Sequence, residues 1–177
     1  MNDNMLRAQA TAVFSAKLAS TIDALNADIL TIKQSYNGRG LPHSSMTVHD
    51  IYRRIDDSIY QLGAVAQESV IQAYEAGAHK VSRKLEAQLL DAFESCFAEG
   101  FRQMSDLRES ATKAIRDALA NKQMTASDSH LEASKRVLLK SQIVLRGYYQ
   151  TQSRARKKWY EYMPEIREWL RWIFRQS

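Results

Sequence analysis

Apolar residues return every three or four positions along most of this 177-residue chain, and only two prolines and six glycines interrupt them. This spacing places the apolar residues on one face of a helix, which turns once every 3.6 residues. Alanine, leucine, glutamine, glutamate, lysine and arginine dominate the composition, and these residues favour helices. We therefore predict an all-α fold, an elongated helical bundle or coiled-coil-like protein of four to five helices that forms one domain over residues 1–177.

The first helix is predicted over residues 1–36, where Val13, Ile22 and Ile29 belong to one apolar row. It should end in the segment 36–42, because two glycines and a proline there oppose helix continuation. The next helix is expected to begin at Thr47, since a threonine hydroxyl caps orphan backbone N–H groups and Asp50 follows three residues later.

The central region, residues 47–122, carries one apolar row almost without interruption. Read as a single long helix it would extend roughly 110 Å, a length that only a coiled coil or an extended bundle supports. Breaks are conceivable at Gly63, Gly77 and Gly100, but no proline or turn cluster accompanies them. The pattern favours one long or kinked central helix, with two antiparallel helices as the alternative.

The C-terminal region, residues 126–177, begins with cap-forming residues at 125–130 and continues as a third helix. Its apolar positions are expected to face the core: Leu131, Leu138, Leu139, Val144, Leu145 and Tyr148. Pro164 should occupy the first turn of a separate last helix, where a missing N–H costs little.

Charge is distributed unevenly along the chain. Residues 131–177 contain eleven Lys/Arg against four Asp/Glu, eight of the sixteen aromatic residues and all three tryptophans. The remainder has a net charge of −2. Cations interleaved with aromatic rings are typical of surfaces that bind polyanions. We predict contact with nucleic acid or a nucleoprotein assembly through seven residues: Arg146, Arg154, Arg156, Lys157, Lys158, Tyr149 and Trp159.

Two alternatives stay open for the same region. The last helix has a face of large apolar residues suited to docking on a protein partner: Ile166, Trp169, Leu170, Trp172, Ile173 and Phe174. The basic run is otherwise a solvated helix face, with the aromatic residues packed in the core. The long apolar rows also suggest a homo-oligomer, such as a dimer, because helices must bury their apolar faces against something.

No residue pattern predicts catalysis, a metal site or a cofactor, so we expect a protein that is not an enzyme. Glu75 and His79 share a helix face, and His43 and His49 flank a cap, but each is explained by solvated or capping contacts. The run from Ser127 to His130 is best read as helix capping, since catalytic triads assemble from separated segments.

The chain contains one cysteine, Cys96, within an apolar row, which suggests a reducing, cytoplasmic setting. It has neither the pattern of a signal peptide nor an uncharged apolar run long enough to cross a membrane. We therefore expect a soluble or at most peripheral protein without integral membrane insertion.

Overall fold

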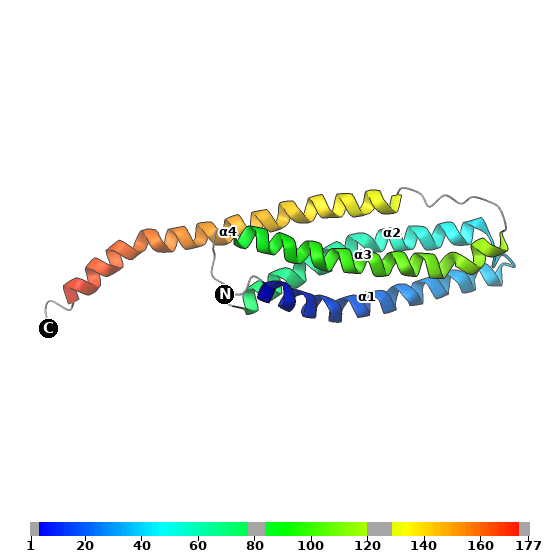
Figure 1. Cartoon of the computed structure of the whole chain (residues 1–177), viewed down its shortest axis with the longest axis horizontal. Coiled ribbons are helices and arrows are strands. Elements are labelled where there is room, and N and C mark those ends of the chain that lie inside the picture. The colour runs from blue at the N-terminus through cyan, green and yellow to red at the C-terminus, as the bar shows by residue number, and fades with distance from the viewer. Residues whose placement is uncertain (1–3, 78–83, 120–128, 174–177) are drawn as a thin grey trace.

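Four helices make up the computed structural model, which describes residues 4–77, 84–119 and 129–173 and, within these ranges, the side chains of residues 5–154. They are α1 (Asn4–Gly38), α2 (Ser45–Ala76), α3 (Leu85–Ala118) and α4 (Ser129–Ile173). Successive helices run in opposite directions, and the molecule is elongated along their common axis (Figure 1). The described part of the chain contains no strand, so the all-α prediction is confirmed.

The connection between α1 and α2 lies in the predicted turn. Gly40 has a φ of 71°, a left-handed conformation that glycine adopts without steric penalty. The cap of α2 is Ser44, whose Oγ accepts a hydrogen bond of 3.1 Å from the Thr47 N–H. The predicted cap residue, Thr47, is instead buried inside the first turn, and its hydroxyl donates to the Leu41 carbonyl.

The core is built around α2 and α3. Helix α1 packs on both of them, and α4 packs on both from another side without contacting α1. The largest fully buried side chains come from all four helices: Phe14, Leu25, Val48, Ile51, Ile55, Ile59, Leu62, Leu85, Leu89, Phe93, Met104 and Leu145. Because only one side of α4 meets α2 and α3, much of its surface faces away from the bundle.

The single long helix expected over residues 47–122 is two helices in the structure. Helix α2 ends at Ala76, where the Gly77 N–H bonds to the Ala73 carbonyl, and α3 begins at Leu85. The two helices lie side by side (Figure 1). This arrangement buries both halves of the apolar row against each other, whereas one extended helix would leave the row uncovered.

Gly63 and Gly100 lie within α2 and α3 and do not break them, because both are points of close helix packing. A methyl group at Gly63 would lie 2.2 Å from Val137 Cγ1 of α4. One at Gly100 would lie 2.4 Å from Leu62 Cδ1 and 2.9 Å from Phe14 Cζ. Only a residue without Cβ allows these helices to approach so closely.

The separate last helix expected from Pro164 is also not observed. Helix α4 continues through this position to Ile173, and its outer part curves (Figure 1). A proline removes one backbone hydrogen bond and bends a helix more readily than it ends one when the flanking turns are good helix formers. The described chain therefore contains four helices.

Candidate binding site on helix α4

Helix α4 lies beside the bundle for only part of its length. Its first residues contact the middle of α2 and α3, where His130 meets Asp56 and Ser105. Farther along, Tyr148 bonds to Glu75 and Arg146 pairs with Glu86. These partners stand at the last turn of α2 and the first turn of α3, so α4 passes the end of both helices at about residue 150.

Residues Thr151–Ile173 of α4, which we call the arm, therefore project beyond α1, α2 and α3 (Figure 1). At 1.5 Å per residue the arm is about 35 Å long. Its sequence holds six Lys/Arg, three Glu and five aromatic residues. The basic and aromatic sequence is thus concentrated on the part of the helix that has no other described helix beside it.

A buried polar cluster, the anchor, holds the start of α4 against the bundle. His130 Nδ1 lies 2.8 Å from Asp56 Oδ1, and the Ser129 hydroxyl donates to Asp56 Oδ2 at 2.6 Å. On its other side, His130 Nε2 lies 3.1 Å from Ser105 Oγ, and the imidazole ring stacks on Phe101 with 4.7 Å between centroids. His130 is 5% exposed, so the cluster joins α2, α3 and α4 away from water.

Ser105, His130 and Asp56 follow the hydrogen-bond order of a Ser–His–Asp triad, but the environment of Ser105 differs from that of a catalytic serine. Its hydroxyl also donates to the Phe101 carbonyl at 2.8 Å, and its backbone lies within α3. Backbone N–H groups in the middle of a helix are bonded within that helix, so they are not free to stabilise an oxyanion. We interpret the cluster as a structural anchor.

Arg108 adds positive charge to the anchor. Its guanidinium carbon lies 3.9 Å from the centre of the Tyr52 ring, and two of its nitrogens, Nε and Nη2, are buried without a hydrogen-bond partner. Burial alone raises the pKa of the Asp56 carboxyl. Hydrogen bonds from His130 and Ser129 and the charge of Arg108 outweigh this effect, so the pKa of Asp56 lies below its ordinary value.

A second set of polar contacts holds α4 near the point where it leaves the bundle. Arg146 Nε lies 3.3 Å from Glu86 Oε1, and the Tyr148 hydroxyl donates to Glu75 at 3.0 Å. The Tyr148 ring meets Tyr74 edge to face at 5.9 Å. Burial and then the neighbouring Glu75 carboxylate raise the pKa of Tyr148. These contacts fix the direction in which the arm projects.

The residues predicted to bind nucleic acid fall into three groups. Arg146 is ion-paired with Glu86, and Tyr149 is half-buried against the core. Arg154 is exposed and has no ion pair among the described residues. The remaining positions lie on the arm, where the backbone is described but the side chains are not: Arg156, Lys157, Lys158 and Trp159.

The predicted protein-docking positions also lie on the arm. The backbone is helical at five of them, whose side chains are outside the described part of the structure: Ile166, Trp169, Leu170, Trp172 and Ile173. The sixth, Phe174, lies outside the described residues altogether.

The expected inward face of α4 is only partly correct. Leu145 is buried and Leu138 and Tyr148 are half-buried, but three of the expected core residues are exposed: Leu131, Leu139 and Val144. The buried row instead contains small or polar residues beside its aliphatic ones: Ala133, Ser134, Val137, Ser141 and Leu145. Small side chains dominate there because α4 approaches Gly63 of α2 closely.

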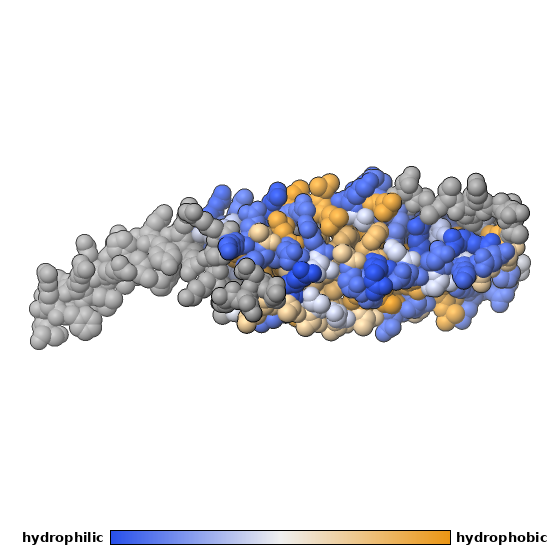
Figure 2. All heavy atoms as spheres, viewed as in Figure 1, coloured by the Kyte–Doolittle hydropathy of each residue, from blue (hydrophilic) through white to orange (hydrophobic). Residues whose placement is uncertain are grey.

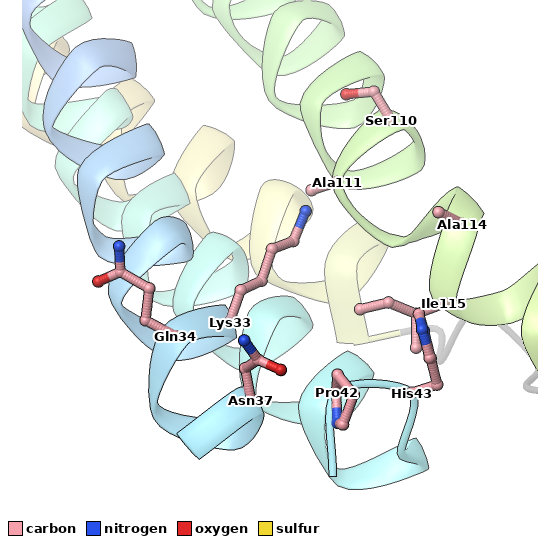
Figure 3. Close-up of a pocket in the computed structure, with 9 residues that line it drawn as sticks. All are labelled: Lys33, Gln34, Asn37, Pro42, His43, Ser110, Ala111, Ala114 and Ile115. Carbon is pink, nitrogen blue, oxygen red and sulfur yellow. The ribbon is translucent and has the colours of Figure 1, made fainter. Parts of the chain in front are cut away.

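Away from α4, a cavity of about 320 Å³ lies at the opposite end of the bundle, between the end of α1 and the end of α3. Figure 3 shows Lys33 directed toward Ala111, and His43 beside Ile115. The walls are mainly apolar, and no group of three or more potential metal ligands occurs among the described residues. The arrangement gives no indication of a reaction.

No family model, curated protein or solved structure matches this chain. In the described ranges, no helix has an apolar stretch of the length and hydropathy that crossing a membrane requires. The fold and the contacts of α4 are therefore the basis for inferring a function.

Proposed function

We propose that this protein is a non-catalytic helical binding protein that contacts nucleic acid or a nucleoprotein assembly through the basic α4 arm. The observation that supports this proposal is the departure of α4 from the bundle after Tyr148 and Arg146, its last polar contacts with α2 and α3. Beyond them the chain continues as a helix with twice as many cations as carboxylates in its sequence.

The electrostatic argument is that a projecting helix brings its cations close to phosphates without burying them in the bundle. Arg154 is exposed at the base of the arm, and Arg156, Lys157 and Lys158 follow directly in the sequence. Each phosphate that such cations neutralise releases counterions, which makes binding fall steeply with salt concentration. Aromatic residues interleaved with the cations, such as Trp159, add stacking on exposed bases.

Fluorescence anisotropy with labelled DNA and RNA at several salt concentrations tests this proposal on the full chain. The double variant Arg154→Gln/Lys158→Gln removes one arginine and one lysine from the arm. If both contact phosphates, the slope of log affinity against log salt becomes shallower by roughly 1.4 to 1.8. Absence of binding by the unmodified protein at low salt contradicts the proposal.

A matched control is available on the bundle. Arg53 of α2 and Lys113 of α3 are exposed and have no ion pair within the described part of the chain. The variant Arg53→Gln/Lys113→Gln therefore removes the same two kinds of charge from another surface. It should leave the salt slope unchanged, whereas an equal effect of both pairs would show that net charge alone determines binding.

An alternative function is docking of the arm on a protein partner. It is favoured by the apolar row in the arm sequence, which continues at helical spacing from the stripe that packs on α2 and α3. The variant Trp169→Ala/Leu170→Ala should then abolish binding to the partner without changing the thermal melt. Loss of the melt would instead show that these residues stabilise the fold.

A further inference from the structure

The outer surface of the docked part of α4 is unusually apolar for a solvent-exposed helix. Ile143 is 70% exposed and Leu139 is 63% exposed, the highest values among the large hydrophobic residues in the described ranges. Leu131 is also more than half exposed and lies on the same side, two turns earlier. Hydrophobic residues gather along the upper edge of the molecule, over α4 (Figure 2). We call the row Leu131, Leu139 and Ile143 the outer row.

Positive charge borders the outer row on both sides. At 100° per residue, Arg136 and Lys140 lie along one side of Leu139 and Ile143, and Lys135 and Arg146 along the other. Arg136 and Lys140 are exposed and have no ion pair in the part of the chain that the structure describes. From Ser129 to Arg154 the helix has five cations and one carboxylate, that of Glu132.

We propose that the outer row of α4 is a docking site for an acidic amphipathic helix of a partner protein. The partner would place aliphatic residues on Leu139 and Ile143 and carboxylates beside Arg136 and Lys140. An apolar row flanked by cations matches an apolar row flanked by carboxylates both in hydrophobic contact and in charge. This site is separate from the arm and does not depend on nucleic-acid binding.

Other occupants fit the surface less well. In an antiparallel pair of outer rows, a second copy would place Arg136 and Lys140 opposite the same cations, which repel. An anionic membrane would meet the carboxylates of Glu75 and Glu86, which lie beside α4. Nucleic acid gains neither stacking nor hydrogen bonds from aliphatic side chains.

The test uses the full-length protein and a fluorescein-labelled helical peptide with leucines on one face and glutamates along both borders. The control peptide carries lysine at each glutamate position. The acidic peptide should bind at least tenfold more tightly than the basic one. Leu139→Ser/Ile143→Ser should weaken binding tenfold or more, and Arg136→Glu/Lys140→Glu should reverse the preference between the two peptides.

Matched and competing measurements give the result an unambiguous meaning. Leu30 and Leu41 are also exposed, so Leu30→Ser/Leu41→Ser removes similar apolar surface elsewhere and should change the affinity less than twofold. Equal weakening by both serine pairs would overturn the proposal. So would self-association in sedimentation that Leu139→Ser/Ile143→Ser abolishes, or binding of phosphatidylglycerol vesicles in preference to the acidic peptide.

The proposal can also fail independently of the nucleic-acid function. Arg154→Gln/Lys158→Gln lies on the arm and should leave affinity for the acidic peptide unchanged. Conversely, Leu139→Ser/Ile143→Ser should leave the salt slope for DNA unchanged. Loss of peptide binding in the arm variant would show that the peptide binds the arm, which would overturn the assignment to the outer row.

Discussion

The contact between Gly63 and Val137 controls how closely α4 can approach the bundle. Replacing Gly63 with alanine would place a methyl carbon 2.2 Å from Val137 Cγ1 and 3.5 Å from its Cβ. Carbon atoms in favourable contact stand about 3.5–4.0 Å apart, so either the valine or the helix must move by about 1 Å or more. Valine in a helix has essentially one χ1 rotamer, and the strain therefore falls on the packing of α4.

Two opposing effects determine the stability of Gly63→Ala. Alanine is favoured over glycine inside a helix by about 1 kcal/mol. Overpacking a tight interface costs about 1–3 kcal/mol. The net effect is a destabilisation of about 0–2 kcal/mol, which alone does not identify the cause. Val137→Ala removes the methyl groups involved, so in the double variant the clash disappears while the helix-propensity gain remains.

A double-mutant cycle on Gly63→Ala and Val137→Ala therefore isolates the contact. Urea unfolding followed by circular dichroism should give a double variant more stable than the sum of the single effects by about 1–3 kcal/mol. Gly147→Ala is the control, because nothing lies within 4 Å of the added methyl group. It should stabilise the protein by up to about 1 kcal/mol. Additivity within about 0.5 kcal/mol for the first pair would refute the packing argument.

Three further predictions concern titratable groups. Asp56→Asn should destabilise the protein by about 1.5–3 kcal/mol at neutral pH. Because the pKa of Asp56 is lowered in the folded state, its stabilisation is complete above its unfolded-state pKa and is lost as the pH falls through its folded-state pKa. The urea midpoints of both proteins should therefore converge in acid, and an unchanged gap would contradict this. Tyr148→Phe should remove the tyrosine that ionises at the highest pH in an absorbance titration, since burial and Glu75 raise its pKa; persistence of that transition would assign it elsewhere. Burial raises the pKa of the Cys96 thiol, so a thiol reagent should label it only upon unfolding, and immediate labelling would show that the site is open.

The features that the sequence predicted well are those encoded within a few residues. The turn after α1 was predicted from Gly38, Gly40 and Pro42, and Gly40 adopts the left-handed conformation expected of such a turn. Helical character was predicted from spacing alone, because every helix buries one face. The cap was misplaced by three residues since Ser44 and Thr47 are both good caps, and the choice depends on where the chain leaves the turn.

The packing of helices was not predictable in the same way. Apolar spacing is identical whether residues 47–122 form one helix or two antiparallel ones, so it favours neither arrangement. The deciding residues, Gly63 and Gly100, resemble helix breakers in sequence and are contact points in the structure. Their role depends on Val137 and Leu62, which are on other helices and distant in sequence.

The inward face of α4 was mispredicted because its inner row is less hydrophobic than parts of its outer surface. Ala133 and Ser141 are buried, whereas Leu139 and Ile143 are exposed. Hydrophobicity predicts burial only when the most apolar face is the one that packs within the same chain. The anchor was missed for another reason: Asp56, Ser105 and His130 come from three helices.

The anchor also determines how far the arm projects. Along the interface, α4 presents small side chains to α2, and such a surface would tolerate a slide of one helical turn, about 5.4 Å, with little loss of apolar contact. The hydrogen bonds of Asp56 do not tolerate it, because the slide would separate its carboxylate from His130 and Ser129 and leave a partly buried charge unpaired. Polar contacts at the start of the helix thus fix its register, and a single register places the last bundle contacts at Arg146 and Tyr148. The length and direction of the projecting segment are therefore set by residues on the bundle, distant from the basic sequence that the arm carries.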